Sequence, residues 1–262
     1  MKISVVTPVL NGQPYIGACV RSVAGQRVHG VDVEHVVVDG GSTDGTAEVA
    51  EAEGATVLVG QDKGLYDAMN KGAAASTGEL LCFLGSDDLL LEGALRKVAA
   101  AGDRGGDFIV GGIRWIDEDG RSLGTIAAPP QWIGPAVLAS PDWCVIHQQA
   151  NYVSRELFDR IGGFEEDWKV SADWEFFCRA LDLTRMTRVD DVLAAFRRRP
   201  GQTSATPSAA GERELALIRD KHAPSTPALR WLYQALFRSW INARNPTWAL
   251  TKRGTHVPWS HR

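Results

Sequence analysis

The chain has 262 residues, of which 44% are hydrophobic and 23% are charged, so it can bury one large core or form one domain with an extension. Its formal net charge of −4 argues against general binding of nucleic acid. The charge is unevenly distributed, because residues 221–262 contain seven Lys and Arg and no Asp or Glu. The end of the chain is therefore expected to be a distinct basic segment.

The cysteines and the N-terminus indicate the compartment. The four cysteines are far apart in the sequence and each lies in an apolar stretch: Cys19, Cys82, Cys144 and Cys178. Buried free thiols in a reducing compartment fit this pattern better than disulfides or a metal site. Pro8 and Asn11 interrupt the first apolar run, unlike in a signal peptide, and no stretch approaches the roughly 20 apolar residues of a membrane span. We therefore expect a cytoplasmic protein.

The first hundred residues alternate between predicted strands and predicted helices. The strands are apolar and rich in β-branched residues, and they are expected at 3–9, 35–39, 56–60 and 80–84. Apolar residues at helical spacing predict helices that begin near Pro14, near Ser42 or Asp44, near Leu65 and near Leu91. This alternation predicts a mostly parallel sheet that is covered by helices on both faces.

The pattern changes after residue 106. Two apolar runs flank the turn sequence EDG and predict a hairpin, two helices are expected next, and a closing strand is expected at 189–198. The hairpin strands are expected at 108–117 and 121–128, and the helices at 155–163 and 171–181. The low-complexity stretch 200–211 is expected to be a linker or mobile loop.

An amphipathic helix is predicted near the end of the chain, at 227–244. Its apolar stripe consists of Leu229, Leu232, Tyr233, Leu236, Phe237, Trp240 and Ile241. Such a stripe usually packs on its own domain or on a second subunit. The alternative is a peripheral membrane contact, because arginines beside an apolar face attract anionic lipid. The sequence leaves both alternatives open.

Polar residues follow each of the first four predicted strands. They are the sequence TPVLNG after the first strand, Asp39 after the second, Asp62 and Lys63 after the third, and Asp87 and Asp88 after the fourth. In an open parallel sheet, ligands bind beyond the carboxyl ends of the strands. Each of these residue types is also common in ordinary turns. Their occurrence at four strand ends nevertheless favours a binding site.

The adjacent carboxylates Asp87 and Asp88 repel each other, so a cation would favour their joint ionisation. Oxygen ligands suit Mg²⁺ or Mn²⁺, and a diphosphate is the natural ligand to complete the coordination shell. The alternative is structural, with Asp88 capping a helix and Asp87 lying in a turn. Spacing alone does not separate the two alternatives.

Several motifs occur together in a fixed order along residues 2–200. They are SVVTPVLNG, VVVDGGSTDGT, DKGLYDAMNKG, TGELLCFLGSDD, HQ at 147–148, GGF at 162–164 and ADWEF at 172–176. With this ordered set the chain resembles the inverting family-2 glycosyltransferases. The resemblance implies the α/β GT-A fold, a single Rossmann-like mixed sheet flanked by helices, here with a C-terminal helical extension. It implies a catalytic domain at 1–204, with a nucleotide-binding half (1–105) and an acceptor-binding half (106–204), and a basic helical extension at 205–262.

The resemblance implies roles for the residues at the strand ends. Pro8, Val9 and Asn11 would line the nucleoside pocket, and Asp39 would hydrogen-bond the base. Asp62 and Lys63 would border the nucleotide, with Lys63 near the diphosphate. These implied roles concern the nucleotide-binding half.

The resemblance also implies the groups that carry the chemistry. Asp87 would coordinate Mg²⁺ or Mn²⁺ with Asp88 beside it, although Gly85 replaces the first acid of the family's Asp-x-Asp motif. Asp173 would be the general base, with Glu175 as the second choice. His147 and Gln148 would lie near the sugar and the acceptor. Arg197, Arg198 and Arg199 precede a loop that departs from the family's Gly-Gly-x-Ser pattern, and they form either part of this lid or a solvated strand end.

The implied activity is transfer of a sugar, with inversion, from a nucleotide-diphosphate sugar to the hydroxyl of a sugar, lipid-linked or small-molecule acceptor, as in polysaccharide or glycolipid biosynthesis. Two alternatives remain open. A nucleotidyltransferase is disfavoured because no Gly-rich, Lys-containing loop follows the first strand. A nucleotide-sugar-binding module without catalysis gains weight from Gly85.

Overall fold

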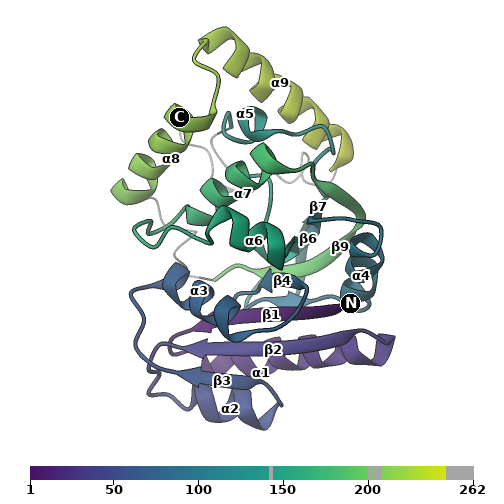
Figure 1. The fold of residues 1–262 in the computed structure, drawn as a ribbon, viewed down its shortest axis with the longest axis vertical. Coiled ribbons are helices and arrows are strands. Elements are labelled where there is room, and N and C mark those ends of the chain that lie inside the picture. Colours follow the sequence, from purple (N-terminus) through teal and green to yellow (C-terminus); the bar gives the residue numbers. More distant parts are fainter. Residues whose placement is uncertain (142–143, 200–201, 203–207, 246–262) are drawn as a thin grey trace.

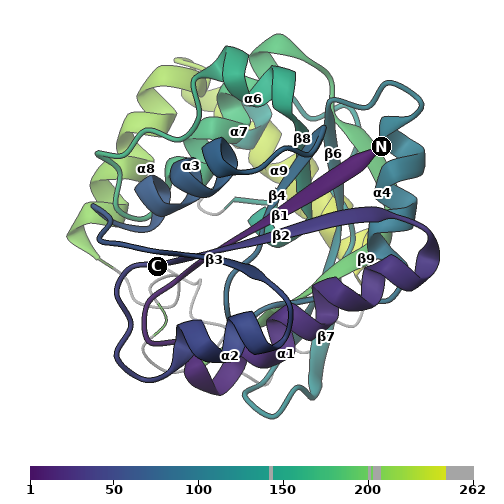
Figure 2. The ribbon, with the colours of Figure 1, turned by 60° about the horizontal axis from the view of Figure 1, so that its bottom comes forward.

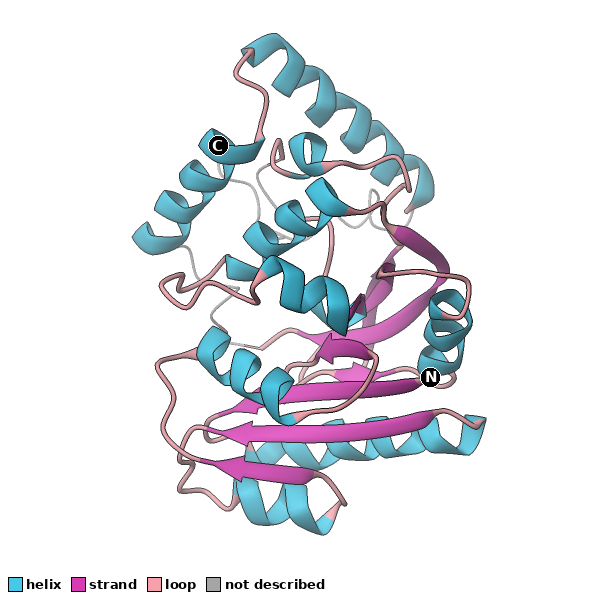
Figure 3. Cartoon of the chain, viewed as in Figure 1, coloured by secondary structure: helices cyan, strands magenta, loops and turns pink. Residues whose placement is uncertain are grey.

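The structure is a computed structural model that describes residues 1–141, 144–199, 202 and 208–245. A single mixed sheet of nine strands runs through the molecule, with helices packed around it (Figure 1). The strand order is β3-β2-β1-β4-β8-β6-β9-β5, and β7 pairs with β6. Figure 3 shows the strands enclosed by helices on both sides. The predicted α/β class with one mixed sheet is confirmed.

The first four strands form the parallel part of the sheet, as predicted. They are β1 (Lys2–Val9), β2 (Asp32–Asp39), β3 (Thr56–Val59) and β4 (Leu80–Phe83). The apolar residues of β1, β2 and β4 are buried, whereas the edge strand β3 is only partly covered; the helices of this half are α1 (Gln13–Ala24), α2 (Thr46–Ala52) and α3 (Leu65–Ala75). Figure 2 shows α1 and α2 on one face of these strands and α3 on the other. All four carboxyl ends consequently meet at one edge.

The second half converts the parallel sheet into a mixed one. β8 (Asn151–Ser154) lies antiparallel to β4, and β6 (Phe108–Ile116) lies antiparallel to β8. β9 (Thr187–Arg197) runs parallel to β6, and the short β5 (Leu89–Leu90) pairs antiparallel with β9. The predicted hairpin is confirmed, since β7 (Ser122–Ile126) pairs antiparallel with β6.

The remaining helices of the first 200 residues are short or cover this second half. They are a 3₁₀ turn (Gly25–His29), α4 (Ala94–Gly102), α5 (Pro135–Leu138), a 3₁₀ turn (Gln148–Ala150), α6 (Arg155–Ile161) and α7 (Ala172–Leu183). The helix expected near Leu91 begins at Ala94, where the left-handed Gly93 precedes it. Both helices expected at 155–163 and 171–181 are confirmed.

An aromatic cluster joins the two halves. Phe164 packs against Phe83 of β4 with ring centroids 4.8 Å apart, and against Phe176 of α7 at the same distance. Asn70 of α3 holds the backbone of Phe164 from both sides, because Asn70 Nδ2 donates to its carbonyl at 2.8 Å and its N–H donates to Asn70 Oδ1 at 3.0 Å. The DKGLYDAMNKG and GGF motifs are therefore packed together.

Two helices follow β9 in the described part of the chain. α8 (Ala209–His222) was not predicted, and it begins inside the predicted linker, where Ser208 Oγ caps it by accepting from Gly211 N at 3.1 Å. The rest of that linker lies largely outside the described residues, as does the predicted domain boundary at 204/205. α9 (Pro227–Arg244) confirms the predicted amphipathic helix.

The rest of the chain covers only part of the α9 stripe. Phe237 and Ile241 are buried, but Leu229, Leu232 and Leu236 are exposed. The helix therefore packs on the domain through Phe237 and Ile241. Its outward line, formed by Leu229, Leu232 and Leu236, faces away from the domain. Within the part of the chain that the structure describes, no helix combines the length and the apolar character needed to cross a membrane.

Candidate functional site

The loops after β1 and β2 are hydrogen-bonded to each other at the carboxyl edge of the sheet. Val9 lies opposite Asp39 in the strand register, and Gly40 N donates to Val9 O at 2.9 Å. Asn11 N donates to Ser42 Oγ at 2.8 Å, and Asn11 Oδ1 accepts from Thr43 N at 3.0 Å. With φ 52°, Asn11 adopts the left-handed conformation that Asn tolerates better than most residues. Pro8, Val9, Asn11 and Asp39 thus form one cluster, as predicted.

Asp39 presents a buried oxygen that lacks a donor. Its Oδ1 accepts from the backbone N–H groups of Gly41 at 2.9 Å and Ser42 at 2.6 Å. Its Oδ2 is buried and has no hydrogen-bond partner among the described residues. Because buried polar atoms are almost always paired, this oxygen is available to an N–H group of a ligand.

Asp62 joins this cluster, whereas Lys63 points elsewhere. Asp62 Oδ1 accepts from Gly64 N at 2.9 Å, and a Cβ added to Gly40 would lie 2.7 Å from Asp62 Oδ2. Lys63 Nζ lies 3.0 Å from Glu166 Oε2, in the segment that precedes α7, and its side chain is 77% exposed. The structure therefore pairs Lys63 with the second half of the chain, and its proximity to a diphosphate stays a prediction.

The acid pair is held by two of the three arginines at the end of β9. Arg199 Nε donates to Asp87 Oδ2 at 2.7 Å, and Arg197 N donates to Asp88 Oδ1 at 2.9 Å. The buried Arg197 side chain also donates to Asp87 O at 2.9 Å. Burial, and then the charge of Asp87, raise the pKa of Asp88 well above its usual value. These two arginines therefore contact the acid pair and do not form a solvated strand end.

The donor atoms here fit a hard cation that substrate oxygens help to hold. Both carboxyl groups converge on Gly85, where an added Cβ would lie 2.7 Å from Asp88 Oδ2 and 3.2 Å from Asp87 Oδ1. A first acid has no room there in this arrangement. In the described segments, no three His, Cys, Asp or Glu side chains gather as a metal site. Mg²⁺ is commonly held by one or two carboxylates with substrate phosphates, so the residues present fit it.

The acid pair lies next to the cluster of Pro8, Val9, Asn11 and Asp39. A Cβ added to Gly12 would lie 3.2 Å from Ser86 Oγ, and Cys19 Sγ lies 3.5 Å from Gly85 O. Tyr15, in the first turn of α1, lies under the guanidinium groups of Arg197 and Arg199, which are 5.1 Å and 5.6 Å from its ring centroid. The residues that follow β1, β2, β3 and β4 therefore form one continuous edge.

Asp173 is the second residue of α7 and lies next to the DKGLY motif. Its Oδ1 accepts from Trp174 N at 2.8 Å and lies 3.3 Å from the Tyr66 hydroxyl. Removal from water raises the pKa of Asp173 to about 6, against the lowering effect of these hydrogen bonds. A carboxylate with such a pKa is ionised at neutral pH and is also basic enough to accept a proton.

Glu175, the second choice for the base, is ruled out by its partners. It is fully buried, and its carboxylate accepts from Arg179 Nε and Lys221 Nζ, both at 2.6 Å. Burial would raise its pKa, but the neighbouring His222, whose Nε2 lies 3.7 Å from Glu175 Oε1, and the hydrogen bonds from Lys221 and Arg179 lower it to about 2. Glu175 is thus the centre of an ion-pair network that joins α7 to α8.

His147 and Gln148 face the interior. Burial lowers the pKa of His147 to about 4, and its Nε2 has no hydrogen-bond partner among the described residues. Gln148 Nε2 lies 3.4 Å from Phe83 O and 3.6 Å from Met69 Sδ, so its amide joins β4 to α3. Phe83 is the last residue of β4, so the Gln148 amide lies at the carboxyl end of this strand, and the implied roles of both residues stay predictions.

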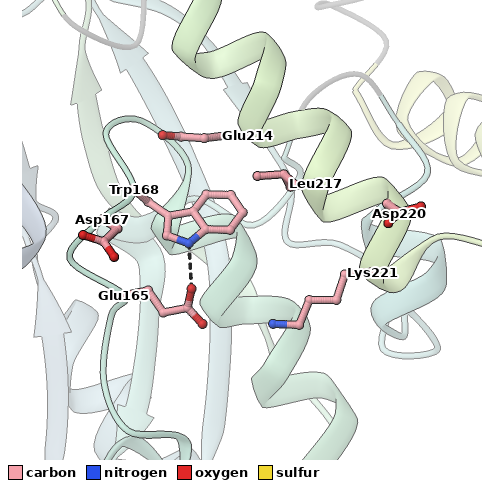
Figure 4. Close-up of a pocket in the computed structure, with 7 residues that line it drawn as sticks. All are labelled: Glu165, Asp167, Trp168, Glu214, Leu217, Asp220 and Lys221. Carbon is pink, nitrogen blue, oxygen red and sulfur yellow. Dashed lines mark hydrogen bonds between the residues drawn. The ribbon is translucent and has the colours of Figure 1, made fainter.

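A cleft of about 400 Å³ lies between α8 and the loop that leads to Asp173 (Figure 4). Trp168 Nε1 donates to Glu165 Oε2 at 2.7 Å, which fixes the indole ring in this loop. The cleft is lined by Glu165, Asp167, Trp168, Glu214, Leu217, Asp220 and Lys221. The loop before α7 is thus open to solvent on the side that faces α8.

Sequence reasoning missed four residues of this region: Tyr15, Tyr66, Arg199 as a partner of Asp87, and Glu214. Tyr66 lies inside a quoted motif, but its partner Asp173 is 107 positions later. Arg199 follows Asp87 by 112 positions. No periodicity or local motif connects such pairs, so only the fold could have identified them.

Comparison with known proteins shows the family of the chain. Residues 4–162 match glycosyl transferase family 2. Over 185 residues the chain is 34% identical to a Mycobacterium tuberculosis protein named PGL/p-HBAD biosynthesis glycosyltransferase, which covers 67% of this chain and 68% of that protein. It is 26% identical over 224 residues to the uncharacterized glycosyltransferase EpsJ of Bacillus subtilis, covering 78% and 63%.

Solved structures show the same fold at low identity. The structure of S. aureus TarS 1–349 in complex with UDP-GlcNAc has a TM-score of 0.66 and 20% identity, and covers 98% of this chain and 77% of that chain. The mannosyltransferase PcManGT from Pyrobaculum calidifontis, in complex with GDP-Man and Mn²⁺, has a TM-score of 0.58 and 19% identity, covering 98% and 76%. The chain therefore belongs to glycosyl transferase family 2, and it is a glycosyltransferase with the GT-A fold.

Proposed function

We propose that this glycosyltransferase moves a sugar from a nucleoside-diphosphate sugar to an acceptor hydroxyl with inversion at the anomeric carbon, assisted by Mg²⁺ or Mn²⁺. The observation that carries the proposal is Asp173, a carboxylate whose pKa is raised to about 6 at the start of α7. A group with this pKa suits removal of a proton from an attacking hydroxyl near neutral pH.

The unpartnered Oδ2 of Asp39 supports a nucleotide donor. A buried carboxylate oxygen pairs well with the ring N–H of uracil or guanine, and two structurally similar proteins were solved with UDP-GlcNAc and with GDP-Man. Pro8, Val9 and Asn11 would contact the nucleoside from the loop after β1. Asp62 would close the same pocket beside Gly40, since the two residues are already in contact.

The reaction then needs one displacement. Asp87, with Asp88 beside it, would hold the divalent ion, which neutralises charge on the departing diphosphate when bound. Arg199 lies next to Asp87 and supplies a second positive charge at the same place. Asp173 would take the proton of the acceptor hydroxyl as its oxygen attacks the anomeric carbon and the bond to the diphosphate breaks. One base and no enzyme nucleophile give a single displacement, and hence inversion.

A panel of UDP-, dTDP- and GDP-sugars tests this activity. Each donor is incubated with Mn²⁺, with Mg²⁺ and with EDTA, and release of nucleoside diphosphate and the anomeric configuration of the product are followed by NMR. Metal-dependent release with inversion supports the proposal, and a retained configuration contradicts it. Release of pyrophosphate from a nucleoside triphosphate would indicate a nucleotidyltransferase. Tight donor binding without turnover would indicate a binding module.

We also propose that α9 contacts an anionic membrane surface, where a lipid-linked or glycolipid acceptor would be found. Its outward line holds Leu229, Leu232 and Leu236, and Trp231 at its border is 68% exposed. The exposed Arg238 and Arg244 lie on the same helix, and residues 221–262 contain no acid. Aromatic and basic residues beside an apolar line suit the interface of an anionic bilayer.

Sedimentation with vesicles tests the membrane contact. Salt-sensitive binding to phosphatidylserine vesicles, absent with phosphatidylcholine alone, should be lost in Leu232→Asp and kept in the exposed control Ser239→Asp. Equal indifference of the wild-type protein to both vesicles contradicts the proposal. A dimer by light scattering that Leu232→Asp dissociates would assign the outward line to a second subunit.

A further inference from the structure

Glu214 of α8 binds the backbone directly before the helix that carries Asp173. Its Oε1 accepts from Lys169 N at 2.6 Å, and its Oε2 accepts from Val170 N at 3.0 Å and Ser171 N at 2.8 Å. The residue is only 8% exposed, and Figure 4 shows its carboxylate above Trp168, on the side of α8 that faces the loop. One side chain thus satisfies three consecutive amide groups.

These contacts hold the backbone that leads into α7, up to the N–H of its N-cap residue Ser171. The first N–H groups of a helix have no partner inside the helix, and a side-chain oxygen usually provides one. Ser171 is the N-cap residue of α7 but makes no side-chain capping hydrogen bond. The Glu214 carboxylate lies beside this positive end of the helix, where a negative charge is favourable. Hydrogen bonds to an ionised acceptor are among the stronger ones in proteins.

Two further contacts hold α8 in place, one of them to α7. Lys221 Nζ donates to Glu175 Oε1 at 2.6 Å, and Arg219 Nη2 donates to Pro141 O at 3.1 Å. The contacts of Glu214 and Lys221 are two turns apart on α8, so the helix cannot turn or slide without breaking one of them. The match to the family ends at residue 162, before α8.

We propose that Glu214 is a positioning residue, which holds the backbone of residues 169–171 so that Asp173 faces the acceptor, and that α8 is therefore part of the catalytic unit. This inference rests on the proposed role of Asp173 as the base. It assigns the first helix of the predicted extension to the active site.

The charged groups around Asp173 make its pKa sensitive to Glu214. The titratable groups that face it are the Tyr66 hydroxyl from α3, the Cys144 thiol and the Glu214 carboxylate from α8. The hydrogen bond from Tyr66 lowers the pKa of Asp173, and the negative charge of Glu214 raises it. Loss of the Glu214 charge should therefore lower the pKa of Asp173, and added exposure to water would act in the same direction.

Two measurements without substrate test the contact itself. Glu214→Gln keeps the size of the side chain but replaces one accepting oxygen with an amide that cannot accept. Amide hydrogen exchange at residues 169–171 should become about tenfold faster or more, because these three N–H groups lose part of their protection. The carbon-13 resonance of the Asp173 carboxyl, assigned with Asp173→Asn, should titrate at lower pH. Glu212→Gln removes the same charge from an exposed position of α8 and should change neither.

Turnover separates a positioning role from a purely structural one. The assay follows metal-dependent hydrolysis of UDP-glucose, UDP-GlcNAc, dTDP-glucose or GDP-mannose, whichever donor the wild-type protein cleaves. Glu214→Gln should lower kcat by about 10- to 100-fold with little change in the KM for the donor, because small displacements of a reacting group cost up to about 10²-fold. Glu214→Asp keeps the charge but shortens the reach, so it should lower kcat while the carboxyl titration changes less.

Each outcome decides one of the two proposals. Unchanged exchange and unchanged titration in Glu214→Gln would overturn the positioning role, whatever the activity. Faster exchange with normal kcat would also overturn it, since the contact would then stabilise the fold alone. If the wild-type protein cleaves no donor while exchange and titration respond as expected, the proposed transferase reaction fails and the contact between Glu214 and residues 169–171 stands.

Discussion

The Tyr66 hydroxyl lies 3.3 Å from Oδ1 of Asp173 and 2.7 Å from the carbonyl oxygen of Val170. It has one hydrogen to donate, so the two acceptors compete for it. Tyr66 is in the first turn of α3, three residues after Lys63, whereas Asp173 is in the first turn of α7. This relationship links the nucleotide side of the site to the candidate base.

Tyr66→Phe should move the acid limb of the pH–rate profile to higher pH. The Tyr66 hydrogen bond favours the ionised form of Asp173, so its loss should raise the carboxyl pKa above about 6. As the pH is lowered, kcat would then begin to fall at a higher pH than in the wild-type protein, while kcat on the plateau changes little. The measurement is kcat against pH with one cleaved donor. The control is Tyr233→Phe on α9, and a limb that stays in place or moves to lower pH would show that Tyr66 does not tune Asp173.

Asp173→Asn should keep donor binding and lower turnover by roughly 10²–10⁴-fold, the usual contribution of a positioned base. In the wild-type protein the base is ionised above a pH of about 6, so the rate should fall as the pH drops through this value. Donor affinity by calorimetry and initial rates across pH measure both effects. Asp182→Asn, an exposed change near the other end of α7, serves as the control. Near-normal turnover by Asp173→Asn would exclude Asp173 as the base.

Asp87→Asn should abolish the metal dependence of donor binding with the fold intact, because the two side chains have nearly the same shape and Asn is a poorer ligand for a hard cation. Thermal denaturation with donor, with and without Mn²⁺, measures this effect. The exposed Asp159→Asn should respond to Mn²⁺ like the wild-type protein. If Asp87→Asn retains the full Mn²⁺ response, the acid pair is not the metal site and its pairing with Arg197 and Arg199 is structural.

The Glu34 carboxylate should stabilise the folded protein at neutral pH and lose this effect in acid. Burial alone would raise the pKa of this carboxyl, but hydrogen bonds from Ser4, Thr77 and Lys2 lower it from 4.5 to about 2. A group whose pKa is lowered by folding stabilises the protein above its unfolded pKa, and the contribution disappears as the pH falls from 4.5 toward 2. Glu34→Gln should lower the free energy of unfolding at pH 7 by about 1–3 kcal/mol, and by less near pH 2.

Urea unfolding between pH 2 and pH 7 measures this difference. Glu51→Gln, an exposed substitution on α2, should match the wild-type protein throughout. A pH-independent difference between Glu34→Gln and the wild-type protein would mean that the carboxylate is not held in its ionised form by β1 and the turn before β4.

The sequence by itself predicted the strands and helices of the first half, because continuous β-branched runs and apolar residues at helical spacing reflect local burial. The hairpin of β6 and β7 was equally local. The ordered motifs placed Asp39, Asp62, Asp87 and Asp173 in one family pattern, and the parallel strand rule predicted that the first three would share one edge. The helix at 227–244 followed from its own amphipathic spacing.

Tertiary structure alone decided what these groups contact. Insertion of β8 between β4 and β6, and the parallel pairing of β6 with β9, are non-local and leave no periodic signal in the sequence. That topology brings Arg199 to Asp87 across 112 residues and Tyr66 to Asp173 across 107 residues. It also brings Glu214 to the start of α7 across 43 to 45 residues. The partial burial of α9 is of the same kind, because an amphipathic pattern shows that an apolar face exists but not how wide a surface the rest of the chain offers it.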